Sequence, residues 1–97
     1  MSQFDVHRLD DGLVVDCQAN LLEHLGSRLV APLILHRGAP TPAQRLNPVF
    51  EIDGRKHVMM TQSVAAVQKQ QLGAVVTSLA DCAFEVTDAL DVLITGV

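Results

Sequence analysis

A helix-type pattern of apolar residues is confined to the C-terminal end of this chain, and strand-type patterns occupy the rest. A long amphipathic repeat occurs only in residues 78–97, where apolar side chains recur at three- and four-residue steps. The preceding residues form short alternating or apolar runs separated by turn residues, without an alternation of strands and helices. That order argues against a parallel sheet, which needs crossover helices between its strands. The sequence therefore predicts a small antiparallel, barrel-like β-sheet followed by one C-terminal α-helix.

The predicted helix starts at Ser78, which forms a capping-box pattern with Asp81. Phe84 and Val92 stand nearer the acidic face than the apolar stripe, and this indicates a second contact surface on the helix. Leu93 begins an apolar end that we expect to pack against another surface, in this chain or in a partner. The apolar stripe consists of Leu79, Cys82, Ala83, Val86, Leu90, Leu93 and Val97.

Before the helix, a hairpin is expected over residues 3–17, and a very hydrophobic strand over residues 28–35. Pro32 lies inside the second of these, so that strand is expected to be at a sheet edge, bulged or bent there. Asp53 and Gly54 predict a two-residue type I′ turn between strands at 49–52 and 55–61. Residues 37–48 read as a loop, and residues 63–72 as either a short strand or a bent loop.

Length and composition favour one small domain, residues 1–97, with the barrel at about 2–76 and the helix at about 78–97. The chain has 97 residues, of which 48% are hydrophobic and only 3% aromatic. A small aliphatic chain has apolar surface that it cannot bury alone, so a homodimer is expected. The net charge is −4, and this argues against non-specific binding of nucleic acid.

The sequence shows no secretory signal and no apolar run long enough to span a membrane, so a cytoplasmic protein without membrane contact is expected. Cys17 and Cys82 are far apart and have no metal-type spacing, so both are expected to be reduced and buried. The four histidines also lack metal-ligand spacing. No metal site and no catalytic residue is predicted.

Several segments resemble the CcdB toxin family, in the family's order and over nearly the whole chain. Residues 15–18 (Val-Asp-Cys-Gln) resemble the family's Val-Asp-Val-Gln, and residues 28–33 (Arg-Leu-Val-Ala-Pro-Leu) resemble its Arg-Met-Val-Ile-Pro-Leu. Residues 47–49 (Asn-Pro-Val) are similar to Tyr-Pro-Val, and residues 59–61 match Met-Met-Thr. Gly73 and Gly96 also match glycines of the family by position.

This resemblance implies an SH3-like barrel with a C-terminal helix that works as a homodimer. It implies the toxin of a type II toxin–antitoxin system, which poisons DNA gyrase by inserting between the A subunits and trapping the cleaved-DNA complex. Such a toxin needs no cofactor and catalyses no reaction of its own. A disordered, CcdA-like antitoxin would bind it and remove it from gyrase. The two proteins together would repress their operon, so operator DNA would be bound only through the antitoxin complex.

By position, the resemblance also assigns contact residues. Thr95 stands where the family has Trp, and Asp91 where it has Asn. Trp contributes more than most residues at interfaces, so the Thr implies weaker gyrase poisoning. Gyrase contact is expected from Leu21, Leu22, Asp91, Ile94, Thr95, Gly96 and Val97, and the dimer interface from Leu90, Leu93, Ile94 and Val97.

Two other functions remain open at this point. One is a MazF-like endoribonuclease toxin built on the same barrel plan, which would need a cationic groove and acid–base residues. The other is an SH3-like interaction dimer that is not toxic, and the Thr at position 95 keeps this alternative open. The charge for an RNA groove would come from Arg28, Arg37, Arg45, Arg55 and Lys56.

Overall fold

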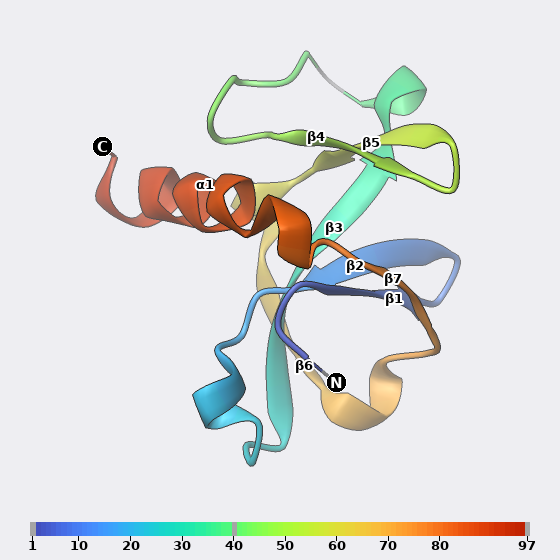
Figure 1. Cartoon of the computed structure of the whole chain (residues 1–97), viewed down its shortest axis with the longest axis vertical. Helices are drawn as coiled ribbons and strands as arrows, with labels where there is room; N and C mark the ends of the chain where they lie inside the picture. Colours follow the sequence, from blue (N-terminus) through green and yellow to red (C-terminus); the bar gives the residue numbers. More distant parts are fainter. Residues whose placement is uncertain (1, 40, 97) are drawn as a thin grey trace.

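The structure is a computed structural model that describes residues 2–39 and 41–96. Within these residues, seven strands form one curled antiparallel sheet, and a single α-helix, α1 (Ala83–Thr95), follows it (Figure 1). The prediction of a small antiparallel β-barrel with a C-terminal helix is therefore confirmed.

Of the six strand pairs in the described sheet, three join strands that are neighbours in the sequence and three join strands that are distant. Its strand order is β4-β5-β3-β2-β1-β7, and β6 pairs with the first half of β3. All of these pairs are antiparallel. The strands are β1 (Asp5–Leu9), β2 (Gly12–Asp16), β3 (Ser27–Leu35), β4 (Val49–Ile52), β5 (Arg55–Met59), β6 (Ala65–Gln68) and β7 (Val75–Ser78).

The β4–β5 hairpin has the turn that the sequence predicts. Asp53 and Gly54 have φ angles of 54° and 77°, and both signs are those of a type I′ turn. Ile52 and Arg55 close the hairpin as paired residues. Local turn chemistry was sufficient to set this register.

Pro32 lies in the centre of the sheet, so the expectation of an edge strand is wrong. β3 pairs with β2 on one side and, on the other, first with β6 and then with β5. The Pro32 carbonyl accepts the Met60 N–H at 2.8 Å, where β3 changes from one partner to the next. A residue in an antiparallel ladder directs its N and its O to the same neighbour. The missing N–H of Pro32 therefore faces the junction between β6 and β5, where it costs little.

Residues 63–72, predicted to be either a short strand or a bent loop, contain both. Residues 63–72 include a short strand, β6, between two 3-10 turns, η3 (Thr61–Ser63) and η4 (Lys69–Gln71). The following strand, β7, was not predicted, and it pairs with β1. Gly73 leads into it, and a Cβ there would come within 3.0 Å of the Arg8 carbonyl oxygen. Glycine at this position lets the chain approach β1 closely enough to pair.

The helix α1 begins at Ala83, later than the predicted start at about residue 78, and the predicted capping box does not form. Ser78 is the last residue of β7 and pairs with Asp5. Its Oγ accepts the Ala80 N–H at 3.1 Å, and one 3-10 turn, η5 (Ala80–Cys82), then leads into α1. Leu79 and Cys82, the residues that directly precede η5 and α1, provide no side-chain cap. Strand pairing at residue 78 took precedence over the local capping signal.

The core lies between the curled sheet and α1. Val86 and Ala89 are the buried residues of the helix, although Ala89 lies outside the predicted stripe. Leu79 is also buried, whereas Leu93 near the end of the stripe is exposed. The sheet contributes mainly aliphatic side chains to this cluster: Val6, Val15, Ala31, Leu33, Phe50, Ile52 and Met59.

Candidate functional site

The last turn of α1 presents apolar side chains to solvent. Ile94 is 76% exposed, and Leu93 beside it is 37% exposed. Phe84, at the other end of the helix, is 73% exposed. Small monomeric domains seldom leave such side chains uncovered together unless they mark a contact surface. The helix end is therefore a candidate binding surface.

The end of α1 is ordered by its own hydrogen bonds. Gly96 adopts a left-handed conformation with φ of 73°, and its N–H donates to the Val92 carbonyl at 2.9 Å. The Thr95 Oγ1 donates to the Asp91 carbonyl at 2.6 Å. These bonds satisfy carbonyls of the last turn that would otherwise lack a helical partner. Ile94 and Thr95 are therefore held on a defined helical turn, and Val97 lies outside the described residues.

A second exposed apolar group comes from the Leu21 loop, which we define as residues 18–26. One 3-10 turn, η1 (Asn20–Leu22), forms its centre. Leu21 is 86% exposed, and Leu22 is exposed beside it. The loop thus carries two adjacent leucines on its surface, as the resemblance to the family implies.

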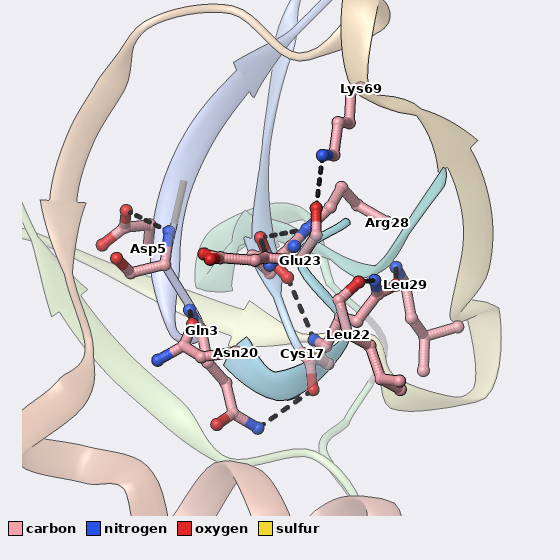
Figure 2. A network of polar contacts seen from close by, with 12 residues as sticks. Gln3, Asp5, Cys17, Asn20, Leu22, Glu23, Arg28, Leu29 and Lys69 are labelled. Atoms are coloured by element: carbon pink, nitrogen blue, oxygen red, sulfur yellow. Dashed lines mark hydrogen bonds and ion pairs between the residues drawn. The ribbon is translucent and has the colours of Figure 1, made fainter. Parts of the chain in front are cut away.

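Side-chain amides hold the backbone of the Leu21 loop in place (Figure 2). The Gln18 Nε2 donates to the Leu22 carbonyl at 2.9 Å, and its Oε1 accepts the Leu29 N–H at 3.1 Å. At the other side of the loop, the Asn20 Oδ1 accepts the Gln3 N–H at 2.8 Å. Gln18 therefore ties the loop to β3, and Asn20 ties it to the start of the chain.

A buried ion pair lies beneath the Leu21 loop. The Arg28 Nη2 and Nε lie 2.6 and 2.8 Å from the Asp16 Oδ2, and both side chains are 0% exposed. The Asp16 Oδ1 accepts the Gln18 N–H at 3.0 Å, so the pair is connected to the loop. Lys69 donates to the Glu23 carbonyl from the side of β6. This network was not predicted from the sequence, although an Asp and an Arg adjoining apolar strand residues were a visible signal.

Among the predicted gyrase-binding residues that the structure describes, those of the Leu21 loop and those of the helix end do not form one continuous surface in a single chain. Figure 1 shows η1 (blue, lower left) and the end of α1 (red, upper left) at separate corners of the molecule. Leu21 and Leu22 belong to the first corner. Asp91, Ile94, Thr95 and Gly96 belong to the second, where all four are exposed.

The predicted dimer residues differ in their surroundings. Leu90 is half-buried and packs against the core of its own chain. Leu93 and Ile94 are exposed and open to a partner. Val97 again lies outside the described residues. Among the described residues of this predicted interface, Leu93 and Ile94 are therefore the ones whose side chains are exposed.

An exposed ion pair connects α1 to the loop before β4. The Arg45 Nε and Nη2 donate to the two Asp88 carboxylate oxygens at 2.9 and 2.6 Å. This hydrogen-bonded contact lowers the pKa of Asp88 and raises the pKa of Arg45. The bidentate geometry fixes the middle of the helix against that loop.

Both cysteines are free thiols, and the expectation that both are buried is correct for Cys17 and wrong for Cys82. Cys17 is buried, whereas Cys82 is half-buried. Burial, reinforced by the neighbouring Asp16 carboxylate, raises the pKa of the Cys17 thiol to about 12. The Cys17 thiol therefore stays protonated at neutral pH and is no nucleophile.

The basic residues named for an RNA groove separate into two groups. Arg28 is buried against Asp16, and Arg45 is paired with Asp88. Arg37, Arg55 and Lys56 are exposed and line one hollow together with Leu35 and His36. Over residues 2–39 and 41–96, no group of three or more His, Cys, Asp or Glu is placed to hold a metal ion. In the same residues, no helix is long and apolar enough to cross a membrane.

The comparisons with known proteins bear on these surfaces. The family model described as CcdB protein matches residues 3–96. A search of the curated proteins found no match. The family match covers every strand, the Leu21 loop and the whole of α1.

Proposed function

Because the chain belongs to the CcdB family, the toxins of ccd toxin–antitoxin systems, we propose that it binds the A subunit of DNA gyrase and poisons the enzyme. It acts in the cytoplasm, without a cofactor and without catalysis of its own. The observation that carries the proposal is the exposed Ile94 on an ordered helix end, within a chain that matches the family from residue 3 to residue 96.

The energy for such an interaction comes from apolar side chains that are exposed in the free protein. Burial of one Leu or Ile is worth about 1.5–3 kcal/mol. Leu21, Leu22 and Ile94 together would thus provide several kcal/mol of apolar burial, before the costs of association are subtracted. Gly96 and Asp91 complete the contact surface at the helix end, together with Val97.

The acting species is a homodimer. Its interface comprises Leu90, Leu93, Ile94 and Val97, so two helix ends meet at the dimer axis and form one probe. A two-fold probe fits a two-fold target such as the paired A subunits. We expect sedimentation to detect a dimer at micromolar concentration, on the order of the affinity that a few buried aliphatic pairs sustain. A clean monomer in this range would contradict the dimer.

A disordered CcdA-like antitoxin neutralises the toxin, and the pair together represses its operon on operator DNA. A partner that binds only the folded state must raise the melting temperature by mass action. We therefore expect a thermal shift when the product of the neighbouring gene is added. No shift would count against that pairing, and binding of operator by this protein alone would contradict the assignment of DNA contact to the complex.

The gyrase assignment is tested by DNA cleavage assays with helix-end variants. Thr95→Trp supplies the anchor that the family has at this position, so trapping of cleaved DNA should increase at least about tenfold, the range set by interface anchors. Asp91→Asn should add to this effect by removing a charge. Thr87→Trp is the matched control, because Thr87 is also exposed on α1 and also donates to a carbonyl of the preceding turn. It should leave trapping unchanged.

These results test two claims separately: that a Trp at position 95 would strengthen the contact with gyrase, and that gyrase is the target at all. If the wild type traps cleaved DNA as well as Thr95→Trp does, the anchor argument is wrong. If no variant traps any, gyrase is not the target. Cleavage of RNA by the purified protein would favour a ribonuclease, and absence of growth arrest on expression would favour an interaction dimer that is not toxic.

A further inference from the structure

The side chain of Gln18 holds the Leu21 loop through both ends of its amide group. Its Nε2 donates to the Leu22 carbonyl at 2.9 Å, and its Oε1 accepts the Leu29 N–H at 3.1 Å. The Gln18 backbone N–H donates to the Asp16 Oδ1 at 3.0 Å, so the side chain starts from a fixed point. Gln18 itself is half-buried, whereas Leu21 and Leu22 are exposed. One side chain therefore connects the exposed leucines to β3.

The Gln18 Oε1 takes the place of a backbone partner for β3. The Cys17 N–H donates to the Leu29 carbonyl at 2.8 Å, just after the last residue of β2. A residue in an antiparallel ladder directs its N–H and its carbonyl to the same neighbour. The Leu29 N–H therefore also faces the side of β2, where the Gln18 Oε1 accepts it. This bond completes the ladder while the backbone turns outward into the loop.

The two bonds of Gln18 need a side-chain amide. One end must accept an N–H, and the other must donate to a carbonyl. A Glu side chain has the same length and accepts, but its carboxylate cannot donate, and a Met side chain does neither. The residue type at position 18 therefore determines whether both bonds form.

These bonds matter because the loop exposes apolar side chains. Leu21 is 86% exposed, and such a side chain gains free energy by folding back onto nearby apolar surface. The two carbonyls that follow Leu21 are each held from outside the 3-10 turn η1. Gln18 holds that of Leu22, and Lys69 donates to that of Glu23 (Figure 2). The backbone on the C-terminal side of Leu21 is thus fixed while its side chain stays outward.

We propose that Gln18 is a positioning residue, which keeps Leu21 and Leu22 in the conformation that binds the gyrase A subunit. This inference rests on the proposed function. Gln18 acts through the loop backbone and makes no contact with the target itself. A loop that is already ordered binds without a further entropy cost. Apparent affinity falls in proportion as the binding-competent conformation becomes less populated.

The test measures the dissociation constant of purified variants for the immobilised gyrase A subunit. Gln18→Met should weaken binding by about tenfold, because loss of a hydrogen bond of ordinary strength changes the population of the held loop by about that factor. Gln18→Glu should weaken it at least as much, since its carboxylate sets a negative charge against the Leu22 carbonyl. Hydrogen exchange of residues 19–26 should become faster in both variants, as the loop opens more often.

Gln62→Met is the matched control for a general loss of stability. Gln62 is exposed, and its Oε1 accepts the Asn47 Nδ2 at 2.7 Å. Asn47 lies just before β4, at the top of Figure 1, whereas η1 lies at the lower left. Gln62→Met should lower the melting temperature about as much as Gln18→Met does. Its affinity for gyrase should change by less than about twofold, because the Leu21 loop keeps its own hydrogen bonds.

A double-variant cycle shows whether Gln18 acts through the exposed leucines. Leu21→Ala removes the larger of the two exposed apolar contacts, so position 18 has less to hold in place. In the Leu21→Ala background, Gln18→Met should weaken binding by about threefold or less, in place of about tenfold. A merely structural role of Gln18 would give the same factor in both backgrounds.

The possible failures are distinguishable. If the wild type binds gyrase and Gln18→Met binds equally well, the positioning role is wrong and the proposed function stands. Equal weakening by Gln62→Met would show an effect of stability alone, and an undiminished effect of Gln18→Met in Leu21→Ala would show that Gln18 does not act through Leu21. No binding by the wild type would reject the proposed function, and this inference with it.

Discussion

Replacing Arg28 by Met should destabilise the protein severely, because it leaves the Asp16 carboxylate buried without its cation. Both side chains are 0% exposed, and two nitrogen–oxygen contacts of 2.6 and 2.8 Å join them. Loss of one partner from a buried pair costs about 3–5 kcal/mol. A domain of this size has only about 5–15 kcal/mol of stability. Arg28→Met should therefore bring the chain close to its unfolding threshold at room temperature.

The reciprocal change and the double variant isolate the pair. Asp16→Leu leaves the guanidinium buried and should cost a similar amount, with about 0.5–1.5 kcal/mol more for the lost hydrogen bond from Gln18. Asp16→Leu with Arg28→Met removes both charges, and replacement of a buried pair by apolar groups is often close to neutral. The double variant should therefore be more stable than either single variant. A coupling energy of at least ~2 kcal/mol is expected.

Urea unfolding of all four proteins at one protein concentration measures these values, because dimerisation would otherwise change the apparent stability. The m-values should agree between variants, which shows that the folded states bury similar surface. If Arg28→Met costs less than about 1 kcal/mol, the range of an exposed pair, the reasoning from burial is refuted. If the double variant loses as much free energy of unfolding as the two single variants lose together, the two side chains are not coupled.

Three further predictions concern the helix and the thiols. Gly96→Ala should cost about 1–2 kcal/mol in urea unfolding, because Gly96 has φ of 73° with no neighbour to hinder a Cβ, and Gly96→Asn should cost less. Iodoacetamide near neutral pH should alkylate Cys82 well before Cys17, whose pKa is raised to about 12 by burial, and mass spectrometry of peptides would reveal the opposite order. The pKa of Asp88 is lowered by Arg45, so its stabilisation is present above the unfolded pKa and disappears as the pH falls through the folded one. Asp88→Asn should then be less stable than wild type at neutral pH but equal to it in strong acid, and a constant difference in thermal unfolding would contradict this.

Local signals in the sequence were sufficient for much of the fold. Asp53 and Gly54 allow positive φ angles with little strain, so the β4–β5 turn followed from two residues. The three- and four-residue repeat identified α1, since Val86 must face a core wherever that core lies. The exposed leucines of the Leu21 loop and the exposed Ile94 were expected from resemblance to a family, and periodicity alone did not locate them.

Other features depended on residues that are distant in the sequence. Ser78 carries a good capping signal, yet pairing with Asp5 made it the end of a strand. Pro32 favours a sheet edge by its chemistry, yet β3 became the central strand because two different partners meet beside it. In both cases, pairing between strands that are distant in the sequence overrides a local preference. The local preference at Ser78 is small, because a helix cap is worth only about 1 kcal/mol.

The sequence by itself determined the classes of element, their order and the turn that joins β4 to β5, because these depend on preferences of neighbouring residues. Only the tertiary structure decided which charges are buried and which are free. It enclosed Arg28 with Asp16 and paired Arg45 with Asp88, and it left Arg37, Arg55 and Lys56 together over an apolar floor. The cost of a charge depends on its solvation and on its partners, and folding brings those partners from distant parts of the chain.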